Sequence, residues 1–142
     1  MVKPIPDEYH TVTPYLVVKG AAKLIDFMKE AFGAQELVRM GGPDGAIGHA
    51  EMRVGDSTVM LADPPGSGAM PGTVVLYVED CDAVYKAALA AGANSERAPE
   101  DMFYGDRSGG VIDPCGNRWW IHTHIEDVSP EEMNKRMAAQ RG

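Results

Sequence analysis

The chain has 142 residues, of which 44% are hydrophobic, and its 21 acidic residues outnumber its 13 basic residues to give a formal net charge of −8. This balance argues against a nucleic-acid partner or an anionic membrane surface, because affinity for phosphate depends on clustered Lys and Arg. No apolar run reaches the roughly 20 residues that cross a bilayer and no signal peptide opens the chain, so we expect no membrane partner and a cytoplasmic location.

The first half of the chain predicts one strand, one helix and three further strands. Residues 12–18 are rich in β-branched and aromatic side chains, and Pro14 favours an edge position for this strand. A helical period begins at Ala21 and ends at Gly33, since glycine readily adopts the left-handed conformation of a helix end. Strands are then predicted at 35–40, 47–54 and 57–61.

The second half repeats this order after a loop rich in Pro and Gly at 63–72, the single predicted linker. A strand is predicted at 74–78, followed by a helix with Asp82 as its N-cap that stops at Gly92, and then by three more strands. A capping box with Pro in the first helical position predicts a final helix at about 129–140, whose apolar stripe is thin.

The two halves form an internal repeat of two βαβββ units, at about 9–63 and 73–125. A unit of roughly fifty residues cannot bury its sheet alone, so we expect the two units to lie side by side and to share a groove. Residues 1–142 are therefore predicted to be one α+β domain of two tandem βαβββ modules, with a U-shaped mixed sheet, helices outside and a C-terminal helix. Concave surfaces of this kind bind small molecules.

Alternation along two strands selects the residues that face this groove. His49, Glu51 and Arg53 share one face of their strand, while the alternate residues are apolar and should pack under the helices. In the last strand, Trp120, His122 and His124 share a face in the same way. An aromatic side chain such as Trp120 offers a surface on which a flat ligand stacks.

Residues 103–110 form a second dense cluster, with aromatic rings, a carboxylate, a guanidinium, a hydroxyl and three glycines. Two interpretations remain open: the cluster clamps an oxygen-rich ligand, or Asp106 and Arg107 satisfy a turn and each other. The candidate ligand-binding residues are therefore His49, Glu51, Arg53, Tyr104, Asp106, Arg107, Trp120 and His122.

Metal binding is an alternative use of three of these residues. His49, Glu51 and His122 have the side-chain types of a metal-binding triad, but the chain contains none of the short His or Cys spacings typical of metal sites. Hydrogen bonds or ion pairs within a polar groove are the competing interpretation. Cys81 and Cys115 are predicted to be free thiols, since two cysteines are too few for a disulfide framework.

Several segments together resemble one known family. They are the repeat itself, residues 47–57, residues 103–109, Asp113-Pro-Cys-Gly116 and the tail 126–133. These features are similar to the glyoxalase/bleomycin-resistance/dioxygenase group, the vicinal oxygen chelate superfamily, and within it to the PhnB-like branch. The resemblance covers nearly the whole chain and implies paired βαβββ modules that usually form a homodimer.

The resemblance also bears on the metal. Metal-dependent members hold their ion with four groove-facing side chains, and the corresponding positions here are Thr13, Val59, Thr73 and Trp120, none of them a good ligand. We therefore expect no metal site and no cofactor, and a protein that binds a small aromatic or amphipathic molecule. The alternatives are a metal-dependent lyase, isomerase or dioxygenase-type enzyme with a displaced site at His49, Glu51 and His122, and a dimeric protein-interaction module.

Overall fold

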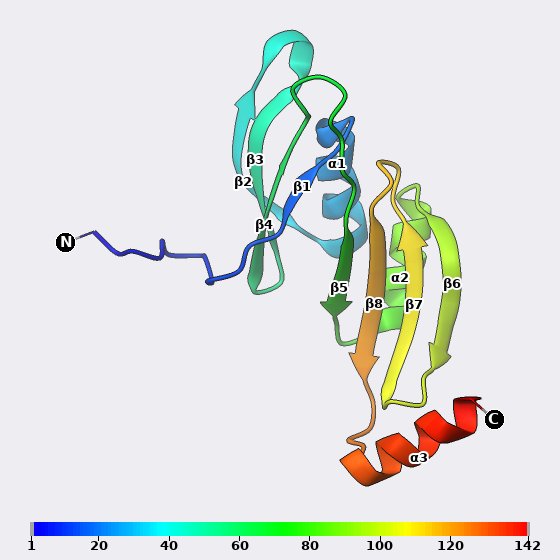
Figure 1. Cartoon of the computed structure of the whole chain (residues 1–142). Helices are drawn as coiled ribbons and strands as arrows, with labels where there is room; N and C mark the ends of the chain where they lie inside the picture. Colours follow the sequence, from blue (N-terminus) through cyan, green and yellow to red (C-terminus); the bar gives the residue numbers. More distant parts are fainter. Residues whose placement is uncertain (1, 142) are drawn as a thin grey trace.

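The computed structural model describes residues 2–141 and contains two modules with the same order of strands and helix (Figure 1). The first module consists of β1 (Tyr15–Val17), α1 (Ala21–Phe32), β2 (Gln35–Gly41), a 3-10 turn (Pro43–Gly45), β3 (Ile47–Val54) and β4 (Ser57–Ala62). The second consists of β5 (Thr73–Tyr77), α2 (Cys81–Ala90), β6 (Asn94–Asp101), β7 (Asp106–Ile112) and β8 (Arg118–His124), followed by α3 (Pro130–Arg141). The predicted α+β fold of two tandem βαβββ modules with a C-terminal helix is confirmed.

Each module has its own four-stranded mixed sheet. The strand orders are β1-β4-β3-β2 and β5-β8-β7-β6, and in both sheets the first strand pairs in parallel with the last strand of its module. The remaining pairs are antiparallel. An isolated bridge outside these ladders, between Val17 and Met70, ties the linker to the first module.

The ends of α1 are fixed by one carboxylate and one glycine. The Asp63 carboxylate accepts hydrogen bonds from the backbone N–H groups of Gly20, Ala21 and Ile47, at 2.8, 3.1 and 2.7 Å. It therefore caps the helix and fastens it to the start of β3. Gly33 ends the helix with φ +66°, as predicted.

One hydrophobic core runs through both modules. Helices α1 and α2 pack against each other, and the rings of Phe32 and Trp119 meet across the module boundary with centroids 4.8 Å apart. The indole N–H of Trp119 donates to the buried carboxylate of Asp113 at 2.7 Å. The modules are thus joined through their helix-covered sides, which leaves the opposite face of each sheet open.

The N-cap of α2 differs from the predicted residue, whereas that of α3 agrees with the prediction. The N-cap of α2 is Asp80, whose side chain accepts from the N–H of Ala83, rather than the predicted Asp82. Asp82 lies inside the first turn, where it pairs with Arg107. The predicted cap of α3 is confirmed, because Ser129 Oγ accepts from the N–H of Glu132 at 3.1 Å.

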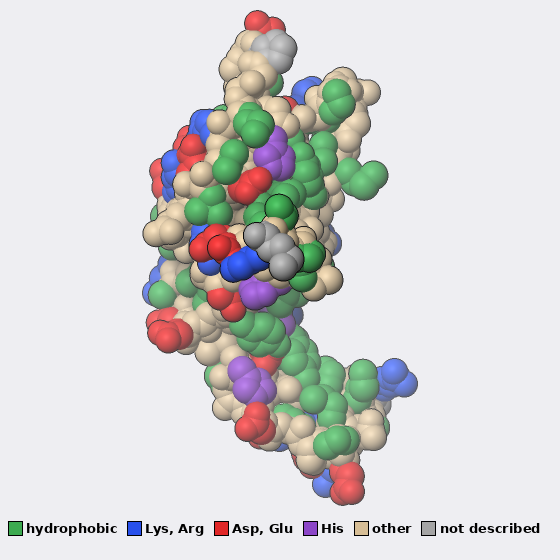
Figure 2. All heavy atoms as spheres, turned by 90° about the vertical axis from the view of Figure 1, so that its left-hand side faces the viewer, with side chains coloured by type: hydrophobic (Ala, Val, Ile, Leu, Met, Phe, Trp, Pro, Cys, Tyr) green, Lys and Arg blue, Asp and Glu red, His purple; other side chains and the backbone are tan. Residues whose placement is uncertain are grey.

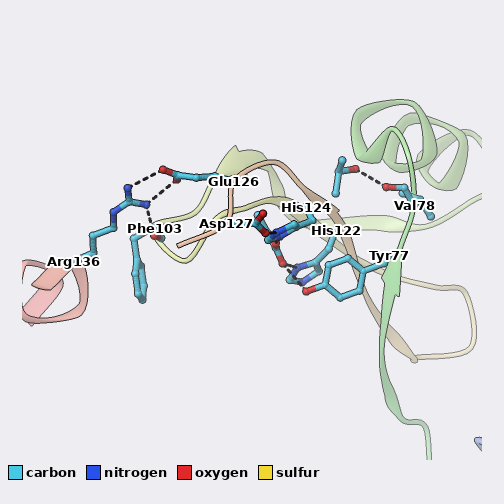
Figure 3. A network of polar contacts seen from close by, with 10 residues as sticks. Tyr77, Val78, Phe103, His122, His124, Glu126, Asp127 and Arg136 are labelled. Atoms are coloured by element: carbon cyan, nitrogen blue, oxygen red, sulfur yellow. Dashed lines mark hydrogen bonds and ion pairs between the residues drawn. The ribbon is translucent and has the colours of Figure 1, made fainter. Parts of the chain in front are cut away.

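Helix α3 is held by polar contacts and buries none of its own residues. Arg136 forms a bidentate ion pair with Glu126 at 2.8 and 2.9 Å and donates to the carbonyl oxygen of Phe103, as Figure 3 shows. The helix therefore lies across one end of the second module (Figure 1). None of the helices within residues 2–141 is long and apolar enough to span a membrane.

Candidate functional site

The open sheet faces carry the polar residues that strand alternation selected. In β3, Ala50 and Met52 are fully buried, whereas His49, Glu51 and Arg53 are half-buried on the other face. In β8, Trp119 and Ile121 are buried, and Trp120 and His122 occupy the opposite face. Figure 2 shows hydrophobic side chains running along the length of the molecule, with histidines and acidic side chains interspersed.

The first module carries a chain of polar contacts on this face. Tyr15 Oη lies 3.2 Å from His49 Nδ1, and His49 Nε2 lies 2.8 Å from a carboxylate oxygen of Glu51. The hydroxyl of Tyr9 is buried next to the same carboxylate but has no hydrogen bond of normal geometry. Burial and the adjacent Glu51 raise the pKa of Tyr9 to about 12. The neighbouring Tyr9 and His49 lower the pKa of Glu51, so Glu51 is ionised at neutral pH.

A cavity of about 430 Å³ opens above Glu51, which we name the Glu51 pocket. Residues of the N-terminal segment 4–13, which leads into β1, form one wall, and Glu51 of β3 and Met60 of β4 form the floor. Most of the lining is apolar or aromatic, including Pro4, Ile5, Pro6, Tyr9 and Met60. A cavity of this size with a few polar groups is typical of small-molecule sites.

Arg53 holds the N-terminal segment in place. Its guanidinium forms an ion pair with the Glu8 carboxylate and donates to the backbone oxygen of Glu8 at 3.1 Å. The hydroxyl of Thr58 donates to the same backbone oxygen at 2.5 Å. Arg53, a predicted ligand-binding residue, thus anchors the wall of the Glu51 pocket.

The second module carries a separate cluster centred on Asp106, which we name the Asp106 cluster. Asp106 is only 3% exposed, and its carboxylate meets Tyr77 Oη at 2.7 Å, His122 Nδ1 at 2.9 Å and His124 Nδ1 at 2.8 Å. His124 Nε2 lies 2.7 Å from Asp127. Figure 3 shows the side chains of Tyr77, His122 and His124 turned toward one centre.

The charges in the Asp106 cluster follow from these contacts. Burial alone would raise the pKa of Asp106, but hydrogen bonds from His124, His122 and Tyr77 outweigh it and lower the pKa below its usual value. Asp106 is therefore an ionised acceptor at neutral pH. Contacts with Asp127 and Asp106 raise the pKa of His124, and the bond to Asp106 raises that of Tyr77, so the phenol stays protonated.

The Trp120 ring lies over the backbone of Gly110, which has no side chain. Gly110 pairs with Trp120 on one side and with Arg97 on the other, and the indole covers the Gly110 Cα. The Arg97 guanidinium sits 5.1 Å from the centre of the Trp120 ring, within the range of a cation–π interaction. Gly110 and Arg97 thus already cover part of the Trp120 ring. Less of the ring is available for stacking against a ligand than we expected from the sequence.

Tyr104 and Arg107 have different positions relative to the Asp106 cluster. The Tyr104 ring lies 6.2 Å from the His122 ring, beside the cluster. Arg107 points to the helix-covered side, where it pairs with Asp82 and Asp101 at 2.9 and 3.0 Å. Neither predicted use of Arg107, as a ligand clamp in the groove or as the partner of Asp106, fits this position, because adjacent strand residues point to opposite faces.

Val59 does not face the groove, contrary to the position expected from the family resemblance. It was matched to a groove-facing position, but it is 4% exposed and pairs with Met52 on the helix-covered side. The residue that corresponds to Trp120 in the structure is Met60, since Tyr15 pairs with Met60 as Val75 pairs with Trp120.

The residues of the displaced metal triad do not fit an ion. His49 and Glu51 bond to each other in the first sheet, whereas His122 belongs to the second sheet and bonds to Asp106. Within residues 2–141, no three His, Cys, Asp or Glu side chains are grouped to hold a metal. The donor set is thus divided between two clusters, and we derive no metal-dependent step from it.

Several residues of the two clusters were not predicted from the sequence. Tyr9 and Tyr15 reach the first cluster, and Tyr77 and Asp127 complete the second. His124 was predicted on the same face as His122, because the two alternate along the strand, and it does belong to the second cluster. The others depend on strand pairing and chain path, which one sequence does not reveal.

Most of the chain is similar in sequence to one protein superfamily and to mycobacterial proteins. The sequence profile described as Glyoxalase/Bleomycin resistance protein/Dioxygenase superfamily matches residues 9–121. An uncharacterized protein of Mycobacterium bovis is 40% identical over 141 aligned residues, which cover 91% of this chain and 93% of that protein. An uncharacterized protein of Mycobacterium tuberculosis H37Rv has the same identity and covers 91% of this chain and 83% of its own length.

Solved structures share the fold at lower identity. TioX from Micromonospora sp. ML1 superposes with a TM-score of 0.70 at 24% identity, over 82% of this chain and 99% of TioX. A structure described as lactoylglutathione lyase from Agrobacterium tumefaciens has a TM-score of 0.63 at 18% identity, over 85% of this chain and 96% of its own. These two similarities concern the fold alone.

Proposed function

Since the chain belongs to the glyoxalase/bleomycin resistance protein/dioxygenase superfamily, we propose that it binds a small, partly aromatic molecule in the Glu51 pocket. The observation that carries this proposal is the pocket itself, a cavity of about 430 Å³ with apolar walls and an ionised carboxylate at its floor. Ligand sites commonly combine such walls with a few polar groups that orient the ligand.

The pocket lining indicates the chemistry of the ligand. Ile5 and Met60 offer apolar contact, and the ring of Tyr9 offers an aromatic wall. Glu51 accepts hydrogen bonds and carries negative charge, so it favours a ligand with an amine, amidine or phenol group. We therefore propose an amphipathic ligand with one donor group and one ring.

A screen by protein NMR tests this proposal. A panel of small aromatic amines, phenols and carboxylates is added to isotopically labelled protein, and shifts of backbone amides are recorded. We expect saturable shifts at residues 5–13, 51 and 60 with the amines and phenols, and none with the carboxylates. An absence of saturable shifts at these residues across the panel would contradict the proposal.

We further propose that the protein is a cytoplasmic homodimer of the PhnB-like branch. The resemblance of residues 103–109 and of the tail to that branch supports the assignment. The outer edge of β5 has no neighbouring strand within residues 2–141, and its side chains Val75 and Tyr77 are 52% and 65% exposed. An exposed apolar edge strand is a common place for subunits to meet. The free thiols Cys81 and Cys115 fit a reducing compartment.

A further inference from the structure

The Asp106 cluster has a property that ligand binding alone does not require. A carboxylate that is 3% exposed is surrounded by three donors from β5 and β8, and two of these are histidines. Buried carboxylates that orient a histidine recur in sites that transfer protons. The Glu51 pocket does not include any of these residues.

The hydrogen bonds determine which nitrogen of His122 carries the proton. An ionised carboxylate only accepts hydrogen bonds, so His122 Nδ1 must be the protonated nitrogen that donates to Asp106. His122 Nε2 has no hydrogen-bond partner among residues 2–141. In the neutral imidazole this nitrogen therefore holds a free lone pair, which is the state of a proton acceptor.

His124 complements the negative charge of Asp106. Its two nitrogens lie 2.8 Å from Asp106 and 2.7 Å from Asp127, so both must donate and the ring is an imidazolium. The Asp106 carboxylate thus forms an ion pair with His124 and orients the ring of His122. His124 has no nitrogen left for a substrate, which leaves His122 as the reactive member of the pair.

Two aromatic side chains lie beside His122. The rings of Tyr77 and Tyr104 lie 5.3 and 6.2 Å from the imidazole, and the His122 side chain is 12% exposed. Tyr77 is itself held by its bond to Asp106. The two phenol rings thus offer aromatic contacts beside His122.

We propose that His122 is an acid–base residue that takes a proton through Nε2 from a planar carbon acid bound against Tyr77 and Tyr104, with Asp106 as its positioning residue. The C–H bond breaks, its electron pair stays on the substrate, and the proton joins the Nε2 lone pair. The Nδ1 proton stays on His122 and remains bonded to Asp106. The imidazolium then returns a proton to the substrate or to water. This site is independent of the Glu51 pocket.

The first test is the protonation state of the histidines, measured by long-range ¹H–¹⁵N NMR of the intact protein at pH 8. We expect His122 to be protonated at Nδ1 alone, and Asp106→Asn to populate the Nε2-protonated form as well. Asp127→Asn is the matched control: it removes a partner of His124 and should leave the His122 spectrum unchanged. Protonation of wild-type His122 at Nε2 would overturn the proposal.

The second test uses 5-nitrobenzisoxazole, a planar aromatic compound that reports proton removal from carbon. Removal of its C3 proton forms a nitrile, breaks the N–O bond and releases a coloured phenolate without any co-reactant. We expect His122→Gln to lower the second-order rate constant about tenfold or more, as for loss of a general base. Lys86→Gln, on the exposed side of α2, should keep the wild-type rate.

Two outcomes of the second test would overturn the proposal. One is an equal rate for the wild type and His122→Gln when circular dichroism shows both to be folded. The other is a loss of rate in His49→Gln but not in His122→Gln, which would assign the base to the first module.

Discussion

Asp106 determines the protonation of three neighbouring side chains. Its carboxylate is buried, yet donors from His124, His122 and Tyr77 lower its pKa. The same contacts raise the pKa of Tyr77 and contribute to the raised pKa of His124. The buried Asp106 charge thus keeps the Tyr77 phenol protonated and His122 in one tautomer, and together with Asp127 it favours the charged form of His124.

His124 should make the stability of the protein depend on pH. Because contacts with Asp127 and Asp106 raise its pKa in the folded state, its contribution is complete below the unfolded value of about 6.5 and is lost as pH rises through the folded value. We expect His124→Gln to lower the free energy of unfolding at pH 5.5 and to have a smaller effect at pH 9, measured by urea titration.

Asp127→Asn serves as the comparison for His124. It removes the larger cause of the pKa shift and should reduce the difference between the two pH values. An equal effect of His124→Gln at pH 5.5 and pH 9 would contradict the assigned ionisation.

Gly110 is required by the position of the Trp120 ring. A Cβ at residue 110 would overlap the indole, so Gly110→Ala should force the ring to move and lower the free energy of unfolding by about 1–3 kcal/mol. Gly68→Ala is the control, since a Cβ there has no neighbour within 4 Å and should change stability by less than about 0.5 kcal/mol. Equal stabilities in a denaturant titration would show that Trp120 does not lie over Gly110.

The faces of single residues were predictable, but their partners were not. Alternation placed His49, Glu51 and His122 on the open faces, because side chains of a strand point to opposite sides in turn. Asp106 and Arg107 were considered as a pair because they are adjacent in sequence. Adjacent strand residues cannot share a face, and Asp106 bonds instead to residues 16 and 18 positions away.

At the scale of elements, the lengths of two hairpins explain the error at Val59. In the first module Val54 pairs directly with Ser57 across a two-residue turn. In the second module Asp113 pairs with Asn117 across three residues, through a backbone bond of 2.9 Å. The extra residue shifts the alignment by one position, and a shift of one in a strand exchanges the two faces.

Strand β5 is the element on which the proposed dimer depends. Its outer edge is unpaired within residues 2–141, and Val75 is 52% exposed. We expect Val75→Lys to weaken the dimer while the subunit stays folded, because a charge on an edge strand opposes pairing with another chain. Light scattering over a dilution series measures the change, with Lys86→Gln as the control. A wild-type monomer at all concentrations would contradict the dimer.

At the scale of the whole molecule, the repeat predicted the fold because each half carries its own strand and helix signals. How the two halves lie relative to each other was harder to predict from the sequence. The two halves do share a surface: they meet on the helix-covered side around Phe32 and Trp119, and residues of both halves line a cavity of about 680 Å³. The polar clusters, however, lie on two separate sheets. The path of residues 4–13 beside Glu51 was not predicted, since most of this segment precedes the predicted strand at 12–18 and has neither helical nor strand periodicity.

The most direct test of the central claim is the affinity of the strongest aromatic amine from the screen, measured by calorimetry for the wild type and for Glu51→Gln. A charge-assisted hydrogen bond contributes about 1.5–3 kcal/mol, so we expect the variant to bind about tenfold or more weakly. Glu30→Gln, on the exposed side of α1, should bind like the wild type. Equal affinity of the wild type and Glu51→Gln would show that the ligand does not bind in the Glu51 pocket.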